Sequence, residues 1–286
     1  MKSHHSCKCC NPKIGTVTIA KNEESNIAKT LESILSQTVK PKQVIVVDDG
    51  STDKTYEIAS SFEDVKVISF PIKHENWVTK KELAKVVNYG LIELDGDLDF
   101  ATAIGSDEVL PPNHFQYLTK KMADENLIIA SGVIKGEYST IPRGSGRIVD
   151  WKWWMQVSGG LYPVNYGFES WMIAKCKAMG KGFKVFPEIE SYVQRPTGTN
   201  YKNKLYLHRG HAYRALGYNR RFVLIRAMLM AIKYKSPYSG YRMIKGFLDK
   251  SVDNYEQDIR DYFRNLQDEQ TSIFNIRDLV NRYREL

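Results

Sequence analysis

The sequence of 286 residues predicts an α/β fold: a mixed, mostly parallel sheet followed by a helical C-terminal extension. From Lys13 to about Glu137, apolar strand-like runs alternate with amphipathic stretches, which is typical of βαβ units. The apolar run Val44–Val47 leads directly into Asp-Asp-Gly-Ser-Thr-Asp, as expected of a buried parallel strand that ends in a polar loop. From Lys202 onward the pattern indicates helices only.

Each element follows from its local pattern. The predicted strands are 16–20, 44–47, 65–70, 99–104, 127–133 and 183–186, all short and rich in apolar residues. The predicted helices are 23–37, 54–62, 77–94, 112–125 and 169–179; in the first, Ile27, Leu31 and Ile34 share one face. We expect 138–165 to be irregular and aromatic, residues 1–12 to be a flexible tail, 13–200 to form one domain and 201–286 to be the extension.

Charge and cysteine content limit the partners and the compartment. The formal net charge of +8 suggests a polyanionic partner: nucleotide phosphates, nucleic acid or an anionic membrane. Nucleic acid is disfavoured, because the basic residues look spread along the chain and no recognition motif is present. Three of the four cysteines crowd the N-terminal tail, which favours a reducing, cytoplasmic compartment over a disulfide framework. We also expect no signal peptide and no membrane span.

Two polar loops carry a family resemblance. Lys-Asn-Glu-Glu at 21–24 follows the first strand, and Asp-Asp-Gly-Ser-Thr-Asp at 48–53 follows the second. This order resembles the start of family 2 glycosyltransferases with the GT-A fold. The resemblance implies that 13–200 is a GT-A catalytic domain. It also implies an inverting, metal-dependent transfer of a sugar from a nucleoside-diphosphate-sugar donor to a hydroxyl of a glycan or lipid-linked acceptor.

The same resemblance implies a metal site. Gly105-Ser-Asp-Glu108 follows a predicted strand and precedes Val-Leu-Pro-Pro, as the family's Asp-x-Asp motif does, although Gly105 replaces the first aspartate. Asp107 is then the implied ligand of Mg²⁺ or Mn²⁺, Glu108 a possible helper, and His208 a candidate further ligand. The alternative is that Asp107 only caps a loop. Two other Asp-x-Asp matches, at 95–97 and 97–99, precede the strand and are interpreted as turn residues.

Nucleotide contacts are implied around the first two strand ends. Asp49 matches the aspartate that pairs with the base, and Ala20 and Glu23 match positions around base and ribose. Ser106 is added as a nucleotide-binding residue. Lys21 stands where the family often has an aromatic residue, so the identity of the base stays open. Arg195 and either Lys202 or Lys204 are candidates to reach the diphosphate from the loop 195–200, which is expected to close over the donor.

The catalytic base is expected later in the chain. Tyr-Gly-Phe-Glu-Ser-Trp at 166–171 resembles the family's Gly-x-Glu-Asp segment, with Ser170 in place of the aspartate, which leaves Glu169 as the implied base. The alternative is an acidic residue that merely suits the first turn of a helix. Trp153 and Trp154 are proposed to line an acceptor or sugar wall, although large aromatic residues belong more often to the core.

Two questions remain open at the level of sequence. The basic, apolar helix at 220–235 either lies on an anionic membrane at its inner face or packs on the catalytic domain or on a second subunit of a homodimer. The departures at Gly105 and Ser170 also allow a catalytically attenuated GT-A scaffold that binds sugar nucleotides or acts as an assembly subunit. A sugar-1-phosphate nucleotidyltransferase is disfavoured, because 13–24 lacks a glycine-rich phosphate loop.

Overall fold

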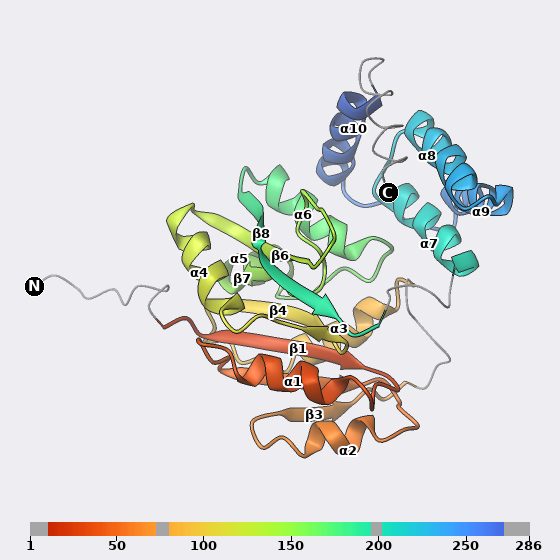
Figure 1. The fold of residues 1–286 in the computed structure, drawn as a ribbon. Coiled ribbons are helices and arrows are strands. Elements are labelled where there is room, and N and C mark those ends of the chain that lie inside the picture. Colours follow the sequence, from red (N-terminus) through yellow and green to blue (C-terminus); the bar gives the residue numbers. More distant parts are fainter. Residues whose placement is uncertain (1–10, 73–79, 196–201, 272–286) are drawn as a thin grey trace, which may run out of the picture. The chain divides into compact units, whose positions relative to one another are not determined.

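The computed structural model describes residues 11–72, 80–195 and 202–271 (Figure 1). Most of the expected tail, the start of the helix predicted at 77, and residues 196–200 of the expected lid lie outside the described residues. The chain divides into two compact units. The α/β unit comprises Met1–Asn76, Ala84–Pro163 and Gly180–Thr197, and the helical unit comprises Trp77–Leu83, Val164–Met179 and Gly198–Leu286.

The α/β unit is built on one sheet with the strand order β3-β2-β1-β4-β7-β6-β8-β5. The strands β1 to β4 all pair in parallel, whereas β7 runs antiparallel to both of its neighbours, β4 and β6, and β8 runs parallel to β6. The mostly parallel sheet predicted from the alternating pattern is therefore confirmed. The strand bounds are β1 Ile14–Ala20, β2 Gln43–Asp48, β3 Lys66–Ser69, β4 Phe100–Gly105, β5 Glu108–Val109, β6 Leu127–Ile134, β7 Ile148–Asp150 and β8 Gly182–Val193.

Helices cover both faces of this sheet, which explains the unbroken apolar character of the central strands. On one face, α1 (Ile27–Leu35), α2 (Thr55–Ser60) and α4 (His114–Asp124) supply side chains to a core that includes Val44 and Val46 of β2. On the other face, α3 (Leu83–Leu91) packs closely, because a Cβ atom on its Gly90 would lie 2.7 Å from Val47. The apolar spacing predicted for the first helix is confirmed: Ile27, Leu31 and Ile34 are all fully buried.

Residues 138–165 are more ordered than we predicted. They contain the short antiparallel strand β7 and the helix α5 (Trp151–Ser158). Asp150 caps this helix, since its carboxylate accepts a hydrogen bond from the Trp153 amide at 2.8 Å. The run of three tryptophans hid the helical period, and the sequence reading of this stretch as irregular was wrong.

Strand β8 is also much longer than the predicted 183–186, and it shifts register against β6 at two points. Gly132 of β6 permits one of these irregular contacts, because a Cβ atom there would lie 2.2 Å from the carbonyl oxygen of Ile189. Beyond this point β8 continues to pair with β5, opposite Glu108 and Val109. The extra length of β8 thus carries the chain to the edge where β5 begins.

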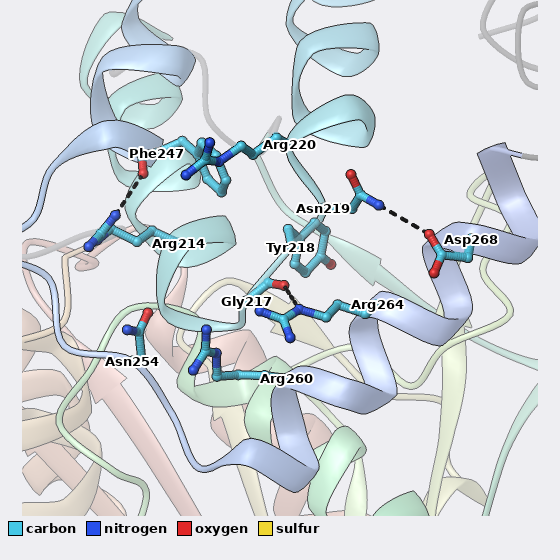
Figure 2. A pocket seen from close by; sticks show the side chains of 10 residues that line it. All are labelled: Arg214, Gly217, Tyr218, Asn219, Arg220, Phe247, Asn254, Arg260, Arg264 and Asp268. Atoms are coloured by element: carbon cyan, nitrogen blue, oxygen red, sulfur yellow. Dashed lines mark hydrogen bonds between the residues drawn. The ribbon is translucent and has the colours of Figure 1, made fainter.

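The helical unit consists of α6 (Phe168–Ala178), α7 (Lys202–Ala215), α8 (Arg220–Lys233), α9 (Pro237–Leu248) and α10 (Gln257–Thr271). Helices α7 and α9 approach backbone to backbone, because Gly210 faces the carbonyl of Met243 and Gly246 faces that of Leu207. The turn between α7 and α8 borders a pocket (Figure 2). The boundary expected at residue 200 differs from this division, which groups 164–179 with the later helices. None of the described helices is both long and apolar enough to cross a membrane.

Candidate active site

The candidate site lies where three neighbouring strands of the α/β unit end. Ala20 of β1 pairs with Asp48 of β2, and Ile19 pairs with Gly105 of β4, so the polar residues that follow these strands emerge at one edge. In open α/β sheets, ligands bind beyond the carboxyl ends of the strands. Asp48, Asp49, Glu23 and Ser106 are all nearly buried at this edge, with 3–6% of their surface exposed.

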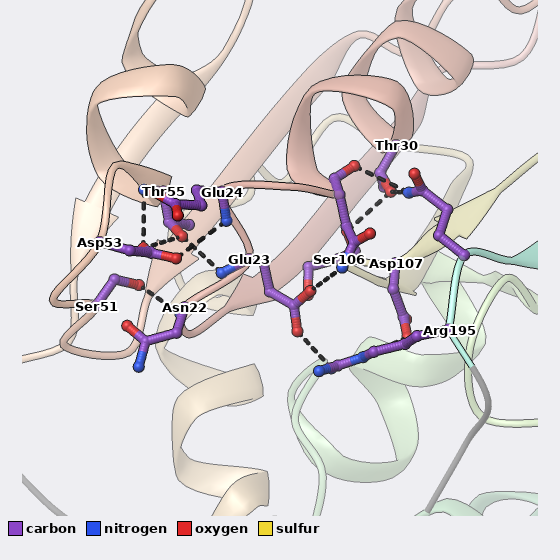
Figure 3. Close-up of polar contacts among 12 residues, drawn as sticks. Asn22, Glu23, Glu24, Thr30, Ser51, Asp53, Thr55, Ser106, Asp107 and Arg195 are labelled. Atoms are coloured by element: carbon purple, nitrogen blue, oxygen red, sulfur yellow. Dashed lines mark hydrogen bonds and ion pairs between the residues drawn. The ribbon is translucent and has the colours of Figure 1, made fainter.

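The loops after β1 and β2 interlock through hydrogen bonds (Figure 3). The amide of Glu23 donates to Thr55 Oγ1 at 2.7 Å, and the amide of Glu24 donates to an oxygen of Asp53 at 3.1 Å. Burial acts to raise the pKa of Asp53, but hydrogen bonds from Thr55 and Glu24 outweigh it and leave the pKa below its usual value. The two motifs that carried the family resemblance are therefore parts of one hydrogen-bonded structure.

A second contact in this structure depends on unusual backbone. The amide of Thr52 donates to Asn22 Oδ1 at 2.8 Å, and the amide of Asn22 donates to Ser51 Oγ at 3.0 Å. Asn22 has a φ of 56°, a left-handed conformation that asparagine tolerates better than most residues. The left-handed backbone and the side-chain hydrogen bond therefore explain why asparagine suits this position of the Lys-Asn-Glu-Glu motif.

Asp49 is held by the backbone of β1. Its amide donates to the carbonyl of Ala20 at 2.8 Å, so Ala20 acts through its main chain. The Nζ of Lys21 lies 3.8 Å from Asp49 Oδ2. The lysine that replaces the family's aromatic residue therefore lies beside the carboxylate expected to meet the base.

Arg195 joins the two sides of the site, as Figure 3 shows. Its Nε donates to Asp107 Oδ2 at 3.0 Å, and its guanidinium forms an ion pair with Glu23 Oε1. Burial raises the pKa of Glu23, and the hydrogen bond from Asn26 and the charge of Arg195 oppose that rise. Because the arginine side chain is 57% exposed, it can change partners without unfolding the site.

The position of Arg195 comes from the end of strand β8. The amide of Gln194 donates to the carbonyl of Asp107 at 2.8 Å, and the Gln194 side-chain amide donates to the carbonyl of Asn26 at 2.9 Å. These bonds fix the chain just before Arg195 against the loop after β1 and the segment after β4. Sequence reasoning placed Arg195 near the diphosphate but missed its carboxylate partners, because the length of β8 was underestimated.

The hydrogen bonds of Glu108 indicate a structural role rather than the metal binding considered for it. Its side chain is 2% exposed, and it accepts hydrogen bonds from the hydroxyls of Ser145 and Ser191, the latter at 2.6 Å. Ser145 Oγ also accepts from the Gly105 amide at 2.7 Å. Glu108 therefore fastens the segment after β4 to its neighbours, and Asp107 is left as the carboxylate at the strand end.

The competing Asp-x-Asp matches lie in a turn that precedes β4, as the sequence predicted. Asp97 is 72% exposed, and its carboxylate lies 2.6 Å from Lys13 Nζ. Asp99 accepts a hydrogen bond from the Lys13 amide at 3.0 Å. These carboxylates stabilise the entry to the strand, at the end remote from Asp107.

The two tryptophans expected to form a sugar wall are core residues in this structure. Trp153 is 4% exposed and Trp154 is fully buried, so neither offers a ring face to a ligand. Trp154 packs edge-to-face on Trp151 and on Tyr162 within the α/β unit. The cause is the helix α5, which turns these rings inward to fill the space beside β7.

The remaining predicted residues belong to the helical unit. Glu169 is an exposed residue in the first turn of α6, and the preceding Gly167 adopts a φ of 76°. His208 lies on α7 and stacks on Tyr166, with ring centroids 5.5 Å apart. Burial lowers the pKa of His208 to about 4, with the charges of His211 and Lys80 acting in the same direction. Within the described residues, no three His, Cys, Asp or Glu side chains converge on a possible metal site.

Known proteins share the fold and part of the sequence. GlyA, a glycosyltransferase of Streptococcus pneumoniae, is 32% identical over 120 residues, which cover 42% of this chain and 16% of GlyA. The mannosyltransferase PcManGT of Pyrobaculum calidifontis, solved with GDP-Man and Mn²⁺, superposes with a TM-score of 0.58 at 15% identity, covering 96% of this chain and 84% of that one. S. aureus TarS with UDP-GlcNAc gives 0.53 at 16% identity over 69% of this chain and 64% of that one.

These likenesses differ in what they establish. The solved structures show that the α/β unit has the GT-A fold predicted from the two loops. The chain spans less than half the length of the curated relatives it matches. The model of the family described as Glycosyl transferase family 2 matches residues 16–181, which is more than half of the chain and includes the ends of β1, β2 and β4. The chain therefore belongs to glycosyl transferase family 2.

Proposed function

We propose that this protein transfers a sugar from a nucleoside-diphosphate-sugar donor to a hydroxyl group of a glycan or lipid-linked acceptor. The observation that carries the proposal is that Glu23, Asp49 and Asp107 follow β1, β2 and β4, and that Arg195, which follows β8, pairs with Glu23 and Asp107. A buried carboxylate suits the hydrogen-bond donors of a base or ribose, and an exposed arginine suits a diphosphate. The membership of the family supports the same assignment.

The donor diphosphate is proposed to bind between Arg195 and Asp107. Arg195 is the cation of this group, and a planar guanidinium matches phosphate oxygens with paired hydrogen bonds. In the free protein its partners are two carboxylates. A bound donor would therefore replace these contacts with contacts between Arg195 and the donor phosphates. Arg195 would thus pair with carboxylates in the free protein and with the diphosphate in the complex.

The residues present also fit a divalent cation, Mn²⁺ or Mg²⁺. Asp107 already engages a positive group through one carboxylate oxygen, and hard oxygen ligands suit these metals. Gly105 supplies no second carboxylate, so the diphosphate would provide most of the other ligands. When bound, such a cation would neutralise charge on the diphosphate leaving group. Asp107 would hold it there, and Glu108 would keep the segment in place through Ser145 and Ser191.

Glu169 is proposed to remove the proton of the acceptor hydroxyl as its oxygen attacks the anomeric carbon. An exposed carboxylate in the first turn of α6 can accept a proton from a bound alcohol. Attack on the face opposite the leaving diphosphate would invert the anomeric configuration. This role comes from the resemblance of 166–171 to the family segment, and it assigns to Glu169 the work done elsewhere by the carboxylate that Ser170 replaces.

The experiment that tests the proposal is donor turnover. The protein is incubated with UDP-, GDP-, dTDP- and CDP-sugars in Mn²⁺, and release of the nucleoside diphosphate is measured with and without glycan acceptors. Wild type and Asp97→Asn should turn over one donor class, whereas Asp107→Asn should lose at least about tenfold, because one charge-assisted contact is worth roughly 1.5–3 kcal/mol. Asp97→Asn is the matched control, since it removes an aspartate of the competing motif.

A second function is favoured by Gly105 and Ser170, which stand where the family motifs have carboxylates. A scaffold that binds sugar nucleotides without turnover would tolerate both of these residues. It would bind a nucleoside diphosphate but release none from any donor. Donor binding without turnover, equal in wild type and Glu169→Gln, would support this alternative.

A further inference from the structure

The helical unit holds a pocket that the proposed function does not use. It has a volume of about 330 Å³ and opens beside the turn between α7 and α8. Figure 2 shows guanidinium groups gathered around this turn from α7, α8 and α10. The basic residues that line it are Arg214, Arg220, Arg260 and Arg264, with Asp268 as the one acidic residue in the lining.

The arginines in this pocket keep unused hydrogen-bonding capacity. The Nε atoms of Arg214 and Arg260 are buried and have no hydrogen-bond partner. Arg264 donates from Nε to the carbonyl of Gly217 at 3.2 Å, and its Nη1 lies 3.7 Å from Asp261 Oδ1. Gly217 has a φ of 72°, and a Cβ atom there would lie 2.7 Å from Arg260, so the turn is shaped to let this arginine lie against it. Buried guanidinium donors without acceptors indicate a site for an anion.

The charge of the whole chain is concentrated in the adjoining helices. Residues 220–248 contain no acidic residue, and they hold seven basic ones: Arg220, Arg221, Arg226, Lys233, Lys235, Arg242 and Lys245. This stretch therefore carries +7 of the net +8, and the rest of the chain nets +1. The basic residues are spread along the chain, since 34 of the 41 lie outside this stretch, but there 33 acidic residues balance them almost completely. A field of one sign at one place attracts an anionic partner.

An exposed apolar row starts at the pocket and runs along α8. Leu224, Met228 and Ile232 are 55%, 56% and 66% exposed, and they follow Arg220 at steps of four residues, so all four share one helix face. Val223 and Ala227, on another face of α8, are buried in the core of the unit.

Three exposed tyrosines follow the row in sequence, at the end of α8 and on α9. Tyr234, Tyr238 and Tyr241 are 44–57% exposed, and rings of this kind are enriched where proteins meet the membrane interface. An α-helix of 14 residues is about 21 Å long, too short for the ~30 Å hydrocarbon core. The row can therefore lie in a bilayer surface but cannot cross it.

We infer that this surface docks on an anionic lipid bilayer, with the arginine-lined pocket receiving a lipid phosphate group and the row 224–228–232 entering the interface. Basic residues around an apolar helix face are typical of interfacial binding. A second copy of the chain fits poorly, because a symmetric contact would bring +7 against +7. A nucleic acid would use the arginines but leave the apolar row without a role.

Vesicle co-sedimentation of the full chain, without any sugar nucleotide, tests this inference independently of the proposed transfer. Vesicles of phosphatidylcholine with phosphatidylglycerol should bind the protein, and vesicles of phosphatidylcholine alone should bind it far less. Arg220→Gln and Arg264→Gln should each weaken binding roughly fivefold, the equivalent of about 1 kcal/mol per basic residue near an anionic surface. Met228→Gln should weaken it on the order of tenfold, because an apolar side chain no longer leaves water.

The matched control is the double variant Lys120→Gln and Lys152→Gln, which removes two exposed positive charges from the α/β unit. It should bind nearly as wild type does, and thermal unfolding should show that every variant is folded. Equal binding to neutral and anionic vesicles would overturn the inference. Arginine variants that bind vesicles as well as the control variant does would also overturn it. The same holds if the protein binds inorganic pyrophosphate but no vesicles, or if it forms a dimer that Met228→Gln dissociates.

Discussion

Replacing Arg195 by glutamine should change two binding constants in opposite directions. In the free protein, Arg195 Nε lies 3.0 Å from Asp107 Oδ2, and a cation that binds Asp107 must displace it. Since the arginine side chain is 57% exposed and the aspartate 20%, this pair is worth only about 0.5–1 kcal/mol. Arg195→Gln should therefore bind Mn²⁺ alone about two- to fivefold more tightly than wild type does.

The same change should weaken nucleotide binding without metal. A nucleoside diphosphate then loses the arginine of its phosphate site, and a hydrogen bond to a charged group is worth roughly 1.5–3 kcal/mol. We expect affinity to fall by about tenfold or more when measured by isothermal titration calorimetry in the presence of a chelator. Lys184→Gln is the control, because it removes a comparably exposed ion pair, with Glu125, that lies away from the strand ends.

The reasoning fails if both affinities move in the same direction. A weaker affinity for Mn²⁺ in Arg195→Gln would mean that the arginine does not compete with a cation at Asp107. An unchanged affinity for the nucleotide would mean that the diphosphate binds elsewhere. Either result would separate the ion pairs of Arg195 from donor binding.

Three further predictions follow from the same structure. Glu169→Gln should reduce the transfer rate by at least about a hundredfold, within the range of general base catalysis, while the calorimetric affinity for the donor stays unchanged. Gly132→Ala should lower the free energy of unfolding by about 2 kcal/mol in urea titrations, because its Cβ would overlap the Ile189 carbonyl, whereas Gly96→Ala, which meets nothing within 4 Å, should not. His208 takes a proton near pH 6.5 in the unfolded chain but only near pH 4 when folded, so wild type should lose stability relative to His208→Gln as the pH falls through this window; a constant difference in melting temperature would contradict the assignment.

The fold was predictable where the local pattern and the tertiary environment agree. Strands such as 44–47 are apolar on both faces because helices cover both sides of the sheet, and that burial is visible in sequence. The prediction failed for α5 and for most of β8. In the first, bulky tryptophans at adjacent positions concealed the helical period, and in the second, polar and apolar residues change faces at two shifts of register.

The strand-end carboxylates of the candidate site were predictable from the sequence, but the contacts between its residues were not. Asp49, Glu23 and Asp107 follow strand ends, and a parallel sheet brings such residues to one edge. The sequence around Arg195 does not predict that Glu23 is its partner, because 172 positions of chain separate the two residues. The inward turn of Glu108 depends on Ser145 and Ser191, which come from two other segments of the chain.

Thermal unfolding with nucleoside diphosphates tests the central claim most directly, namely that the strand ends of β1, β2 and β4 form a donor site. UDP, GDP, dTDP and CDP are each added with and without Mn²⁺ to wild type, Asp49→Asn and Asp97→Asn. The account predicts that one nucleotide at about 100 times its dissociation constant stabilises wild type and Asp97→Asn by roughly 2.7 kcal/mol, more strongly with Mn²⁺, and that Asp49→Asn loses most of this shift. Equal stabilisation of all three proteins, or of none by any nucleotide, would contradict it.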